Sequence, residues 1–121
     1  LSEGTLLMLG LLAVIHQPNR PSLLLLDDLD RGLHPSAQAK LIAGLRILIE
    51  TYDLQILATS HSPYLLDNFE AEEVQVMTFT SEGHVAAARL DTHPEWLEWK
   101  GQLQTGEFWA TVGEDWVGAT R

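Results

Sequence analysis

Apolar and polar positions alternate along the chain with the periods of helices and strands. Apolar residues recur at helical spacing between Leu6 and Ile15, and Pro18 then ends the predicted helix. Leu23–Leu26 and Leu54–Thr59 predict two strands, and their apolar content indicates that both are fully buried. Strands of this kind are typical of a parallel sheet that helices cover.

A second helix is predicted between these strands. Pro35 suits the first position of a helix that runs to about Glu50. Its apolar stripe consists of Ala37, Leu41, Leu45 and Leu48. The strand–helix–strand order predicts a crossover between two parallel strands.

The second half of the chain shows a different pattern. Tyr64–Asn68 predicts a short helix, and the strands Glu73–Thr80 and His84–Leu90 predict a β-hairpin around a turn at 81–83. A short helix is expected after Pro94, followed by a glycine-punctuated tail. All four tryptophans lie in this last quarter: Trp96, Trp99, Trp109 and Trp116. For Trp96 and Trp99, which lie three apart, a small packed core is the default interpretation and an exposed partner-binding face is the alternative.

Polar residues follow both predicted strands of the first half. Asp27 and Asp28 follow the first strand, and Ser60 and His61 follow the second. Because parallel strands end at the same edge of a sheet, these groups are expected to meet there. Two acids suit a hydrated Mg²⁺ ion and an activated water beside a nucleoside triphosphate, whereas an acidic turn is the simpler alternative.

The amino-acid composition limits the kinds of partner and the cellular compartment that are expected. The 121 residues fit one domain, and 17 acidic against 7 basic residues give a formal charge of −10. This charge opposes non-specific binding to nucleic acid or to an anionic membrane. The absence of cysteine excludes disulfides and thiolate metal sites and fits a cytoplasmic protein. No apolar run is long enough to cross a bilayer, and the start at Leu1 inside a motif predicts a piece of a longer protein.

Four short motifs stand in order along the first half of the chain. They are Leu1-Ser2-Glu3-Gly4, Leu23–Asp28, Gly32-Leu33-His34-Pro35 and Thr59-Ser60-His61-Ser62-Pro63. Together they resemble the C-terminal half of an ABC-type ATPase head, as found in the bacterial AAA-family ATPases grouped with the OLD, RecF and SMC-like proteins. The resemblance covers about Leu1–Asn68.

The resemblance implies an α/β fold and two regions. The fold would be a partial P-loop NTPase domain, ABC-ATPase-like, with parallel strands flanked by helices, a C-terminal β-hairpin and a Trp-rich tail. Residues 1–90 would form the C-terminal lobe of the ATPase head, and residues 91–121 a Trp-rich extension.

The resemblance also implies roles for the residues at the strand ends. Asp27 takes the position of the Walker B carboxylate that holds Mg²⁺, and Asp28 that of the catalytic glutamate. The Asp28 side chain is one methylene shorter than glutamate, and a misplacement of about 1 Å can slow a reaction roughly a hundredfold. His61 matches the switch histidine that contacts the γ-phosphate of ATP.

Two further motifs are implied to act between ATPase heads. The signature residues Ser2, Glu3 and Gly4 would cap the nucleotide of the opposite subunit, since a helix N-terminus favours an anion. The loop with Asp30, Gly32 and His34 would cross the dimer interface and sense the partner's nucleotide.

Each residue also has a structural interpretation. Ser2 suits an N-cap, and His34 can pack against the start of the following helix. His61 alone would more often be a partly buried polar residue. Asp30 suits a turn better than a second metal ligand.

The chain lacks a Gly-x-x-x-x-Gly-Lys-Ser/Thr loop, which in the family grips the phosphates. The expected partners are therefore a Walker A half, a second ATPase head in an ATP-dependent homodimer, and a nuclease or other effector. The predicted function is ATP hydrolysis in bacterial DNA repair or phage defence, with this chain inactive alone. A hydrolysis-impaired scaffold that binds an effector is the alternative. A Toprim-like nuclease using Asp28 and Asp30 ranks below both.

Overall fold

The computed structural model describes residues 3–118, which fall into two compact units that divide between Leu65 and Leu66. The predicted boundary lay after Leu90, whereas the structure groups the hairpin with the C-terminal residues. The reason is that one apolar core contains Val76 and Leu90 together with Phe108.

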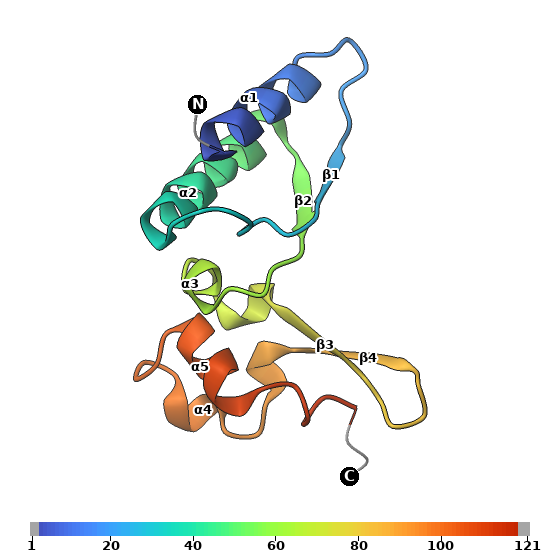
Figure 1. Cartoon of the computed structure of the whole chain (residues 1–121), viewed down its shortest axis with the longest axis vertical. Coiled ribbons are helices and arrows are strands. Elements are labelled where there is room, and N and C mark those ends of the chain that lie inside the picture. Colours follow the sequence, from blue (N-terminus) through green and yellow to red (C-terminus); the bar gives the residue numbers. More distant parts are fainter. Residues whose placement is uncertain (1–2, 119–121) are drawn as a thin grey trace. The chain divides into compact units, whose positions relative to one another are not determined.

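The first unit contains a helix-covered pair of parallel strands (Figure 1). Its elements in order are α1 (Glu3–Ile15), β1 (Leu23–Leu26), α2 (Pro35–Tyr52) and β2 (Gln55–Ala58), and α3 (Pro63–Leu66) follows. The register pairs Leu23 with Gln55 and Leu26 with Ala58, so α2 connects two parallel strands. The predicted strand–helix–strand unit is confirmed.

The ends of α2 follow from its sequence. His34 caps the helix through its ring Nδ1, which accepts a hydrogen bond from the Ser36 backbone N–H at 3.2 Å, and Pro35 occupies the first turn. The helix ends at Asp53, whose φ of 52° is left-handed. The buried face of α2 consists of Gln38, Leu41, Ile42, Leu45 and Leu48, whereas the predicted Ala37 is only half-buried.

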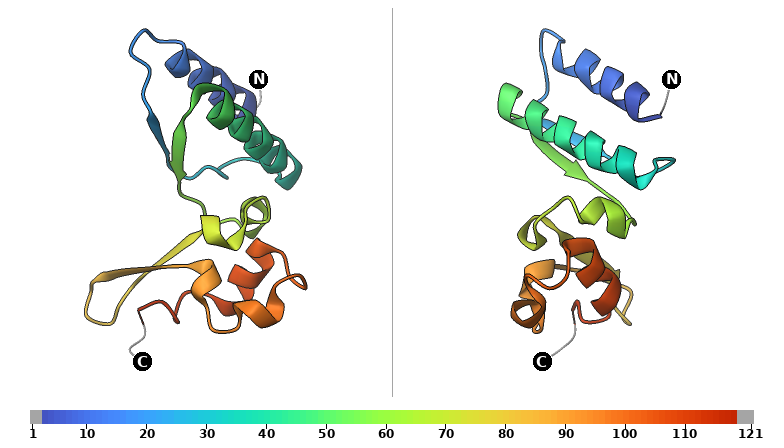
Figure 2. Two further views of the ribbon diagram at one scale, coloured as in Figure 1. Left: turned by 180° about the vertical axis from the view of Figure 1, so that it is seen from behind. Right: turned by 90° about the vertical axis from the view of Figure 1, so that its left-hand side faces the viewer.

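The two strands are not fully buried, and this prediction was wrong. Only Leu24 of β1 is buried, while Leu23, Leu25 and Leu57 expose 47%, 70% and 63% of their surface. The helices α1 and α2 lie on the same side of the two strands (Figures 1 and 2). Since side chains alternate along a strand, every second residue points to the uncovered face.

The helix α1 begins at Glu3, directly after the predicted cap residue Ser2. Glu3 already lies in its first turn, and Leu11 and Ile15 are its buried residues. The predicted cap, Ser2, lies outside the described residues. No helix in the described part of the chain is long and apolar enough to span a membrane.

The second unit is built on the predicted hairpin. The strands β3 (Gln75–Phe79) and β4 (Val85–Arg89) pair in antiparallel register, and one side of the hairpin packs into the core. Four short helices complete the unit: η1 (Ala71–Glu73), η2 (Leu90–Thr92), α4 (Trp96–Trp99) and α5 (Thr105–Val112).

The helix α5 corrects the prediction of an irregular tail. Its start carries a capping box, in which the Gln104 backbone N–H donates to Glu107 Oε1 at 3.0 Å. Phe108 is fully buried and lies edge-on to His93 and Trp96, with ring centroids 5.4 and 5.1 Å away. The expected small core is confirmed, since all four tryptophans pack partly buried against it: Trp96, Trp99, Trp109 and Trp116.

Candidate functional site

The ends of β1 and β2 are joined through one threonine. The pairing continues past the strands, because the Thr59 N–H donates to Leu26 O and the Leu29 N–H to Thr59 O, both at 2.9 Å. The Thr59 Oγ1 donates to Asp27 Oδ1 at 2.6 Å and accepts from the Asp28 N–H at 2.9 Å. The predicted convergence of the two strand ends is therefore present. Sequence reasoning missed Thr59, although a hydroxyl that donates and accepts at a strand end was a usable signal.

Asp28 is held in an unusual conformation. Its φ of 50° lies in the left-handed region, which costs a residue with a Cβ about 1–2 kcal/mol. Its Oδ2 accepts a hydrogen bond from Arg31 Nη2 at 2.6 Å, in a pair whose side chains are 33% and 76% exposed. This hydrogen bond and the charge of Asp28 raise the pKa of the Arg31 guanidinium. Asp28 is thus fixed at its backbone by Thr59 and at its carboxylate by Arg31.

Asp30 links the first strand end to the loop after β2. Partial burial opposes ionisation of Asp30, but hydrogen bonds from the Ser60 side chain and from the backbone N–H groups of Asp30 and His61 outweigh it. The pKa of Asp30 therefore lies below its usual value. Its Oδ1 accepts from the His61 N–H at 3.4 Å, while the His61 side chain is exposed to solvent.

A buried glutamine fixes both loops to α2. Gln38 is only 4% exposed, and its Nε2 donates to the Leu33 carbonyl at 3.1 Å. Its Oε1 accepts from Ser62 Oγ at 3.1 Å, and this same Oγ accepts from the Leu65 N–H at 3.3 Å. The loop before α2 and the loop after β2 are thereby held on one residue. Gln38 was not among the predicted site residues, because a polar residue at one helical position carries no distinctive signal.

The start of α1 meets the loop before α2. The Glu3 carboxylate lies where a Cβ on Gly32 would stand, and Gly32 has a φ of 71°. Gly4 lies beside Leu33, whose Cδ2 is 3.5 Å from the position that a Cβ on Gly4 would take. Two of the predicted signature residues therefore contact the predicted interface loop of their own chain, and Ser2 lies outside the described residues.

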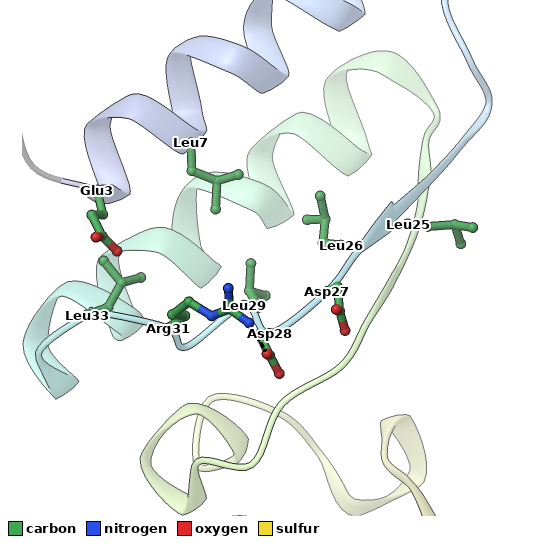
Figure 3. Close-up of a pocket in the computed structure, with 9 residues that line it drawn as sticks. All are labelled: Glu3, Leu7, Leu25, Leu26, Asp27, Asp28, Leu29, Arg31 and Leu33. Carbon is green, nitrogen blue, oxygen red and sulfur yellow. Dashed lines mark hydrogen bonds and ion pairs between the residues drawn. The ribbon is translucent and has the colours of Figure 1, made fainter.

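Some of these residues, among them Glu3, Asp27 and Asp28, line a cavity of about 320 Å³. Figure 3 shows the Asp27 and Asp28 carboxylates side by side at one end and Glu3 at the other. The complete lining is Glu3, Leu7, Leu25, Leu26, Asp27, Asp28, Leu29, Arg31 and Leu33.

The donor set at the strand ends fits Mg²⁺ held largely by water. Asp27 is exposed, and the hydrogen bond from Thr59 occupies only Oδ1. Within residues 3–118 no group of three or more His, Cys, Asp or Glu side chains is arranged to hold a metal ion. Mg²⁺ commonly binds through one or two carboxylates, keeping its remaining ligands as water or substrate phosphate. The residues therefore suit a hydrated ion beside a nucleotide and do not form a metal cage.

Comparison with known proteins identifies the family at a general level. The family described as "AAA domain, putative AbiEii toxin, Type IV TA system" matches residues 1–67, more than half of the chain. No curated protein matches the chain. The match confirms the predicted AAA-type relationship and a nucleotide-binding, ATPase-like function, without singling out the OLD, RecF or SMC-like groups. The chain belongs to this AAA domain family.

Proposed function

We propose that the chain supplies the metal-binding and water-activating part of an ATP-hydrolysing site of the ABC type. The observation that carries the proposal is the Thr59 hydroxyl, which brings Asp27 and Asp28 to the end of β2. Acidic groups and His61 therefore lie at neighbouring ends of two parallel strands, where nucleotides bind in sheets of this type. A role in DNA repair or phage defence stays a prediction of the resemblance.

Asp27 is the proposed holder of Mg²⁺. Its carboxylate is exposed, and the hydrogen bond from Thr59 fixes its orientation. When bound, Mg²⁺ offsets the negative charge of the phosphate oxygens. Asp27 and Thr59 would position this charge before the nucleotide arrives.

Asp28 and His61 are the proposed groups beside the phosphates. Asp28 would orient the attacking water through its carboxylate, of which Arg31 binds only Oδ2. The exposed His61 side chain is free to reach a γ-phosphate oxygen as a hydrogen-bond donor. The signature residues Ser2, Glu3 and Gly4 and the loop with Asp30, Gly32 and His34 are proposed to face a second head.

The rest of the site is proposed to come from the polypeptide that carries the phosphate-binding loop. The uncovered face of β1 and β2 presents Leu23, Leu25 and Leu57, which are 47–70% exposed. Apolar area of this kind gains about 25 cal/mol for each Å² that a second layer covers. We propose that the loop-bearing half packs here and that ATP then joins two complete heads.

Binding of nucleotide to the chain is testable by NMR. We expect millimolar Mg-ATP to shift the backbone amides of Asp27, Asp28 and His61, because these groups would border the phosphates. Asp27→Asn should remove the Mg²⁺-dependent part of these shifts, while its amide oxygen can still accept from Thr59. Asp91→Asn, which removes a carboxylate from the other unit, is the matched control and should leave the shifts intact.

The NMR result can contradict the proposal in two ways. Shifts that avoid the strand ends would place nucleotide elsewhere, and shifts that persist in Asp27→Asn would remove Asp27 from the metal site.

The role of Asp28 is testable where both parts of the site are present in one protein. Asp28→Asn should abolish ATP turnover and retain an ATP-bound dimer. Arg31→Gln is the matched control, because it breaks the same ion pair and keeps the Asp28 carboxylate. We expect this variant to keep turnover. Unchanged turnover in Asp28→Asn would exclude Asp28 from the chemistry.

A second candidate is a regulatory ATPase-like domain with impaired hydrolysis. The observation that favours it is the 2.6 Å ion pair that occupies Asp28, together with the short side chain of this residue. The two candidates predict different results for a protein that contains both this chain and the phosphate-binding loop. The first candidate predicts Mg²⁺-dependent ATP turnover, and the second predicts little or none. Binding without turnover in both the unsubstituted protein and Arg31→Gln would support the regulatory role.

A further inference from the structure

The hairpin of the second unit is apolar on both of its faces. Met77, Phe79 and Val85 expose 61%, 77% and 56% of their surface, and Ala87 is also exposed. The register pairs Met77 with Ala87 and Phe79 with Val85, so these four residues form two adjacent cross-strand pairs on one face. Met77, Phe79, Val85 and Ala87 make up the hairpin apolar face.

The opposite face of the same hairpin already belongs to the core. Val76 is 4% exposed, and Ala86 and Ala88 pack partly buried against the same cluster. An antiparallel pair with one face in the core normally places polar residues on the other. The hairpin apolar face departs from this pattern, and a contiguous exposed apolar patch marks an interaction surface.

The size of this surface limits what it can bind. Two strands of five residues span roughly 17 Å by 10 Å, which is on the order of 200 Å², whereas a stable interface buries about 800 Å² on each partner. The surface therefore suits a short segment of a partner better than a second folded copy of this chain.

The charge of the second unit further limits the kind of partner that this surface can bind. Residues 66–121 contain eleven Asp and Glu against three Lys and Arg, a formal charge of −8 out of −10 for the whole chain. The one cation on the hairpin, Arg89, is bound by Asp91 at 2.8 and 3.0 Å and lies in the field of Glu72. Glu82 is exposed in the turn at the other end of the hairpin.

An acidic unit of this kind repels nucleic acid, anionic membranes and its own copies. It attracts cationic segments, and the attraction weakens as salt screens it. Charge and apolar surface together therefore favour a basic polypeptide with apolar side chains.

We propose that the hairpin apolar face binds a partner-protein segment whose apolar side chains are flanked by lysine or arginine. Phe79 would be the main anchor, because it is the largest and most exposed side chain of the set. The acidic surroundings would raise the association rate and select basic partners.

The test uses the full chain and two synthetic peptides. The first peptide has a central Val-Leu-Val-Leu segment between pairs of lysines, and the second has glutamates in place of the lysines. NMR titration should shift the amides of Gln75–Phe79 and Val85–Arg89 with the lysine peptide. We expect the glutamate peptide to bind at least tenfold more weakly than the lysine peptide. Added salt should lower the affinity of the lysine peptide.

Two variants separate the anchor from general hydrophobicity. Phe79→Ser should lower the affinity for the lysine peptide at least tenfold. Leu97→Ser removes another highly exposed apolar side chain of the same unit, at 83% exposure, and should leave binding unchanged. Both side chains are on the surface, so neither change should unfold the unit.

Several outcomes would overturn the proposal. Equal binding of the two peptides would remove the charge argument, and equal binding by Phe79→Ser would remove the anchor. A dimer of the chain alone that Phe79→Ser dissolves, or binding to anionic lipid vesicles through this face, would assign the surface to a different occupant.

Discussion

Thr59→Val removes one hydroxyl and keeps the shape of the side chain, so it tests directly how the strand ends are joined. In the structure this hydroxyl accepts from the Asp28 N–H at 2.9 Å and donates to Asp27 at 2.6 Å. Thr59 is exposed, so water can replace part of each bond, and the net contribution of a typical hydrogen bond applies. Loss of the bond to the Asp28 N–H should cost about 1 kcal/mol, which is roughly a fivefold change in an equilibrium constant.

The measurement is hydrogen–deuterium exchange of individual backbone amides. The Asp28 amide should exchange roughly fivefold faster in Thr59→Val, because it loses its acceptor. Thr59→Ser keeps the hydroxyl and should restore slow exchange.

The Leu29 amide is an internal control. It donates to the Thr59 backbone carbonyl at 2.9 Å, which the substitution does not touch, so its exchange should stay the same. If the Asp28 and Leu29 amides accelerate together, the strand end has frayed as a whole. If the Asp28 amide does not accelerate, the hydroxyl does not hold it, and the reasoning about the joined strand ends is wrong.

Three further predictions concern the stability of the two units. Phe108→Ala should lower the free energy of unfolding of the second unit by about 3–5 kcal/mol, because Phe108 is fully buried; tryptophan fluorescence during urea denaturation measures this, since all four tryptophans lie in that unit. The second prediction concerns Asp91, which accepts hydrogen bonds from Arg89. These bonds lower the pKa of the Asp91 carboxyl, and they outweigh burial, which raises it. The lowered pKa stabilises the folded second unit fully above about pH 5, and this stabilisation disappears as the pH falls through the ordinary carboxyl pKa of 3.8 and then through the lowered pKa. In Asp91→Asn, the acid unfolding curve should lack this pH-dependent contribution. Gly32→Ala should destabilise the first unit by about 1–2 kcal/mol, because of its φ of 71° and the contact with Glu3; thermal denaturation followed by circular dichroism measures the loss, and equal stability of the two proteins would contradict it.

Local sequence determined most of the elements of the first unit. The run Leu23–Leu26 forms a strand with the predicted bounds, and Pro35 starts α2 where its fixed φ and missing N–H are tolerated. The α5 helix was missed, although the capping box at Gln104 was visible, because glycines on both sides suggested a loop.

The meeting of the strand ends was predictable, whereas the groups that join them were not. Parallel pairing of β1 and β2 follows from a short crossover, so Asp27 and His61 had to share one edge. Thr59 bonds Asp27, which is 32 positions away, and Gln38 bonds Ser62, which is 24 positions away. Nothing in the local sequence of either residue encodes these distant partners.

What the sequence by itself determined was therefore the helices and strands of the first unit, the hairpin and the order of the four motifs, because these depend on apolar period, prolines and caps within a few residues. Only the tertiary structure decided which strand faces are covered, that Arg31 forms an ion pair with Asp28, and that the hairpin shares a core with α5. The physical reason is that burial and ion pairing depend on which distant segments supply the neighbouring atoms. A strand of four leucines has the same sequence whether one face or both faces are covered.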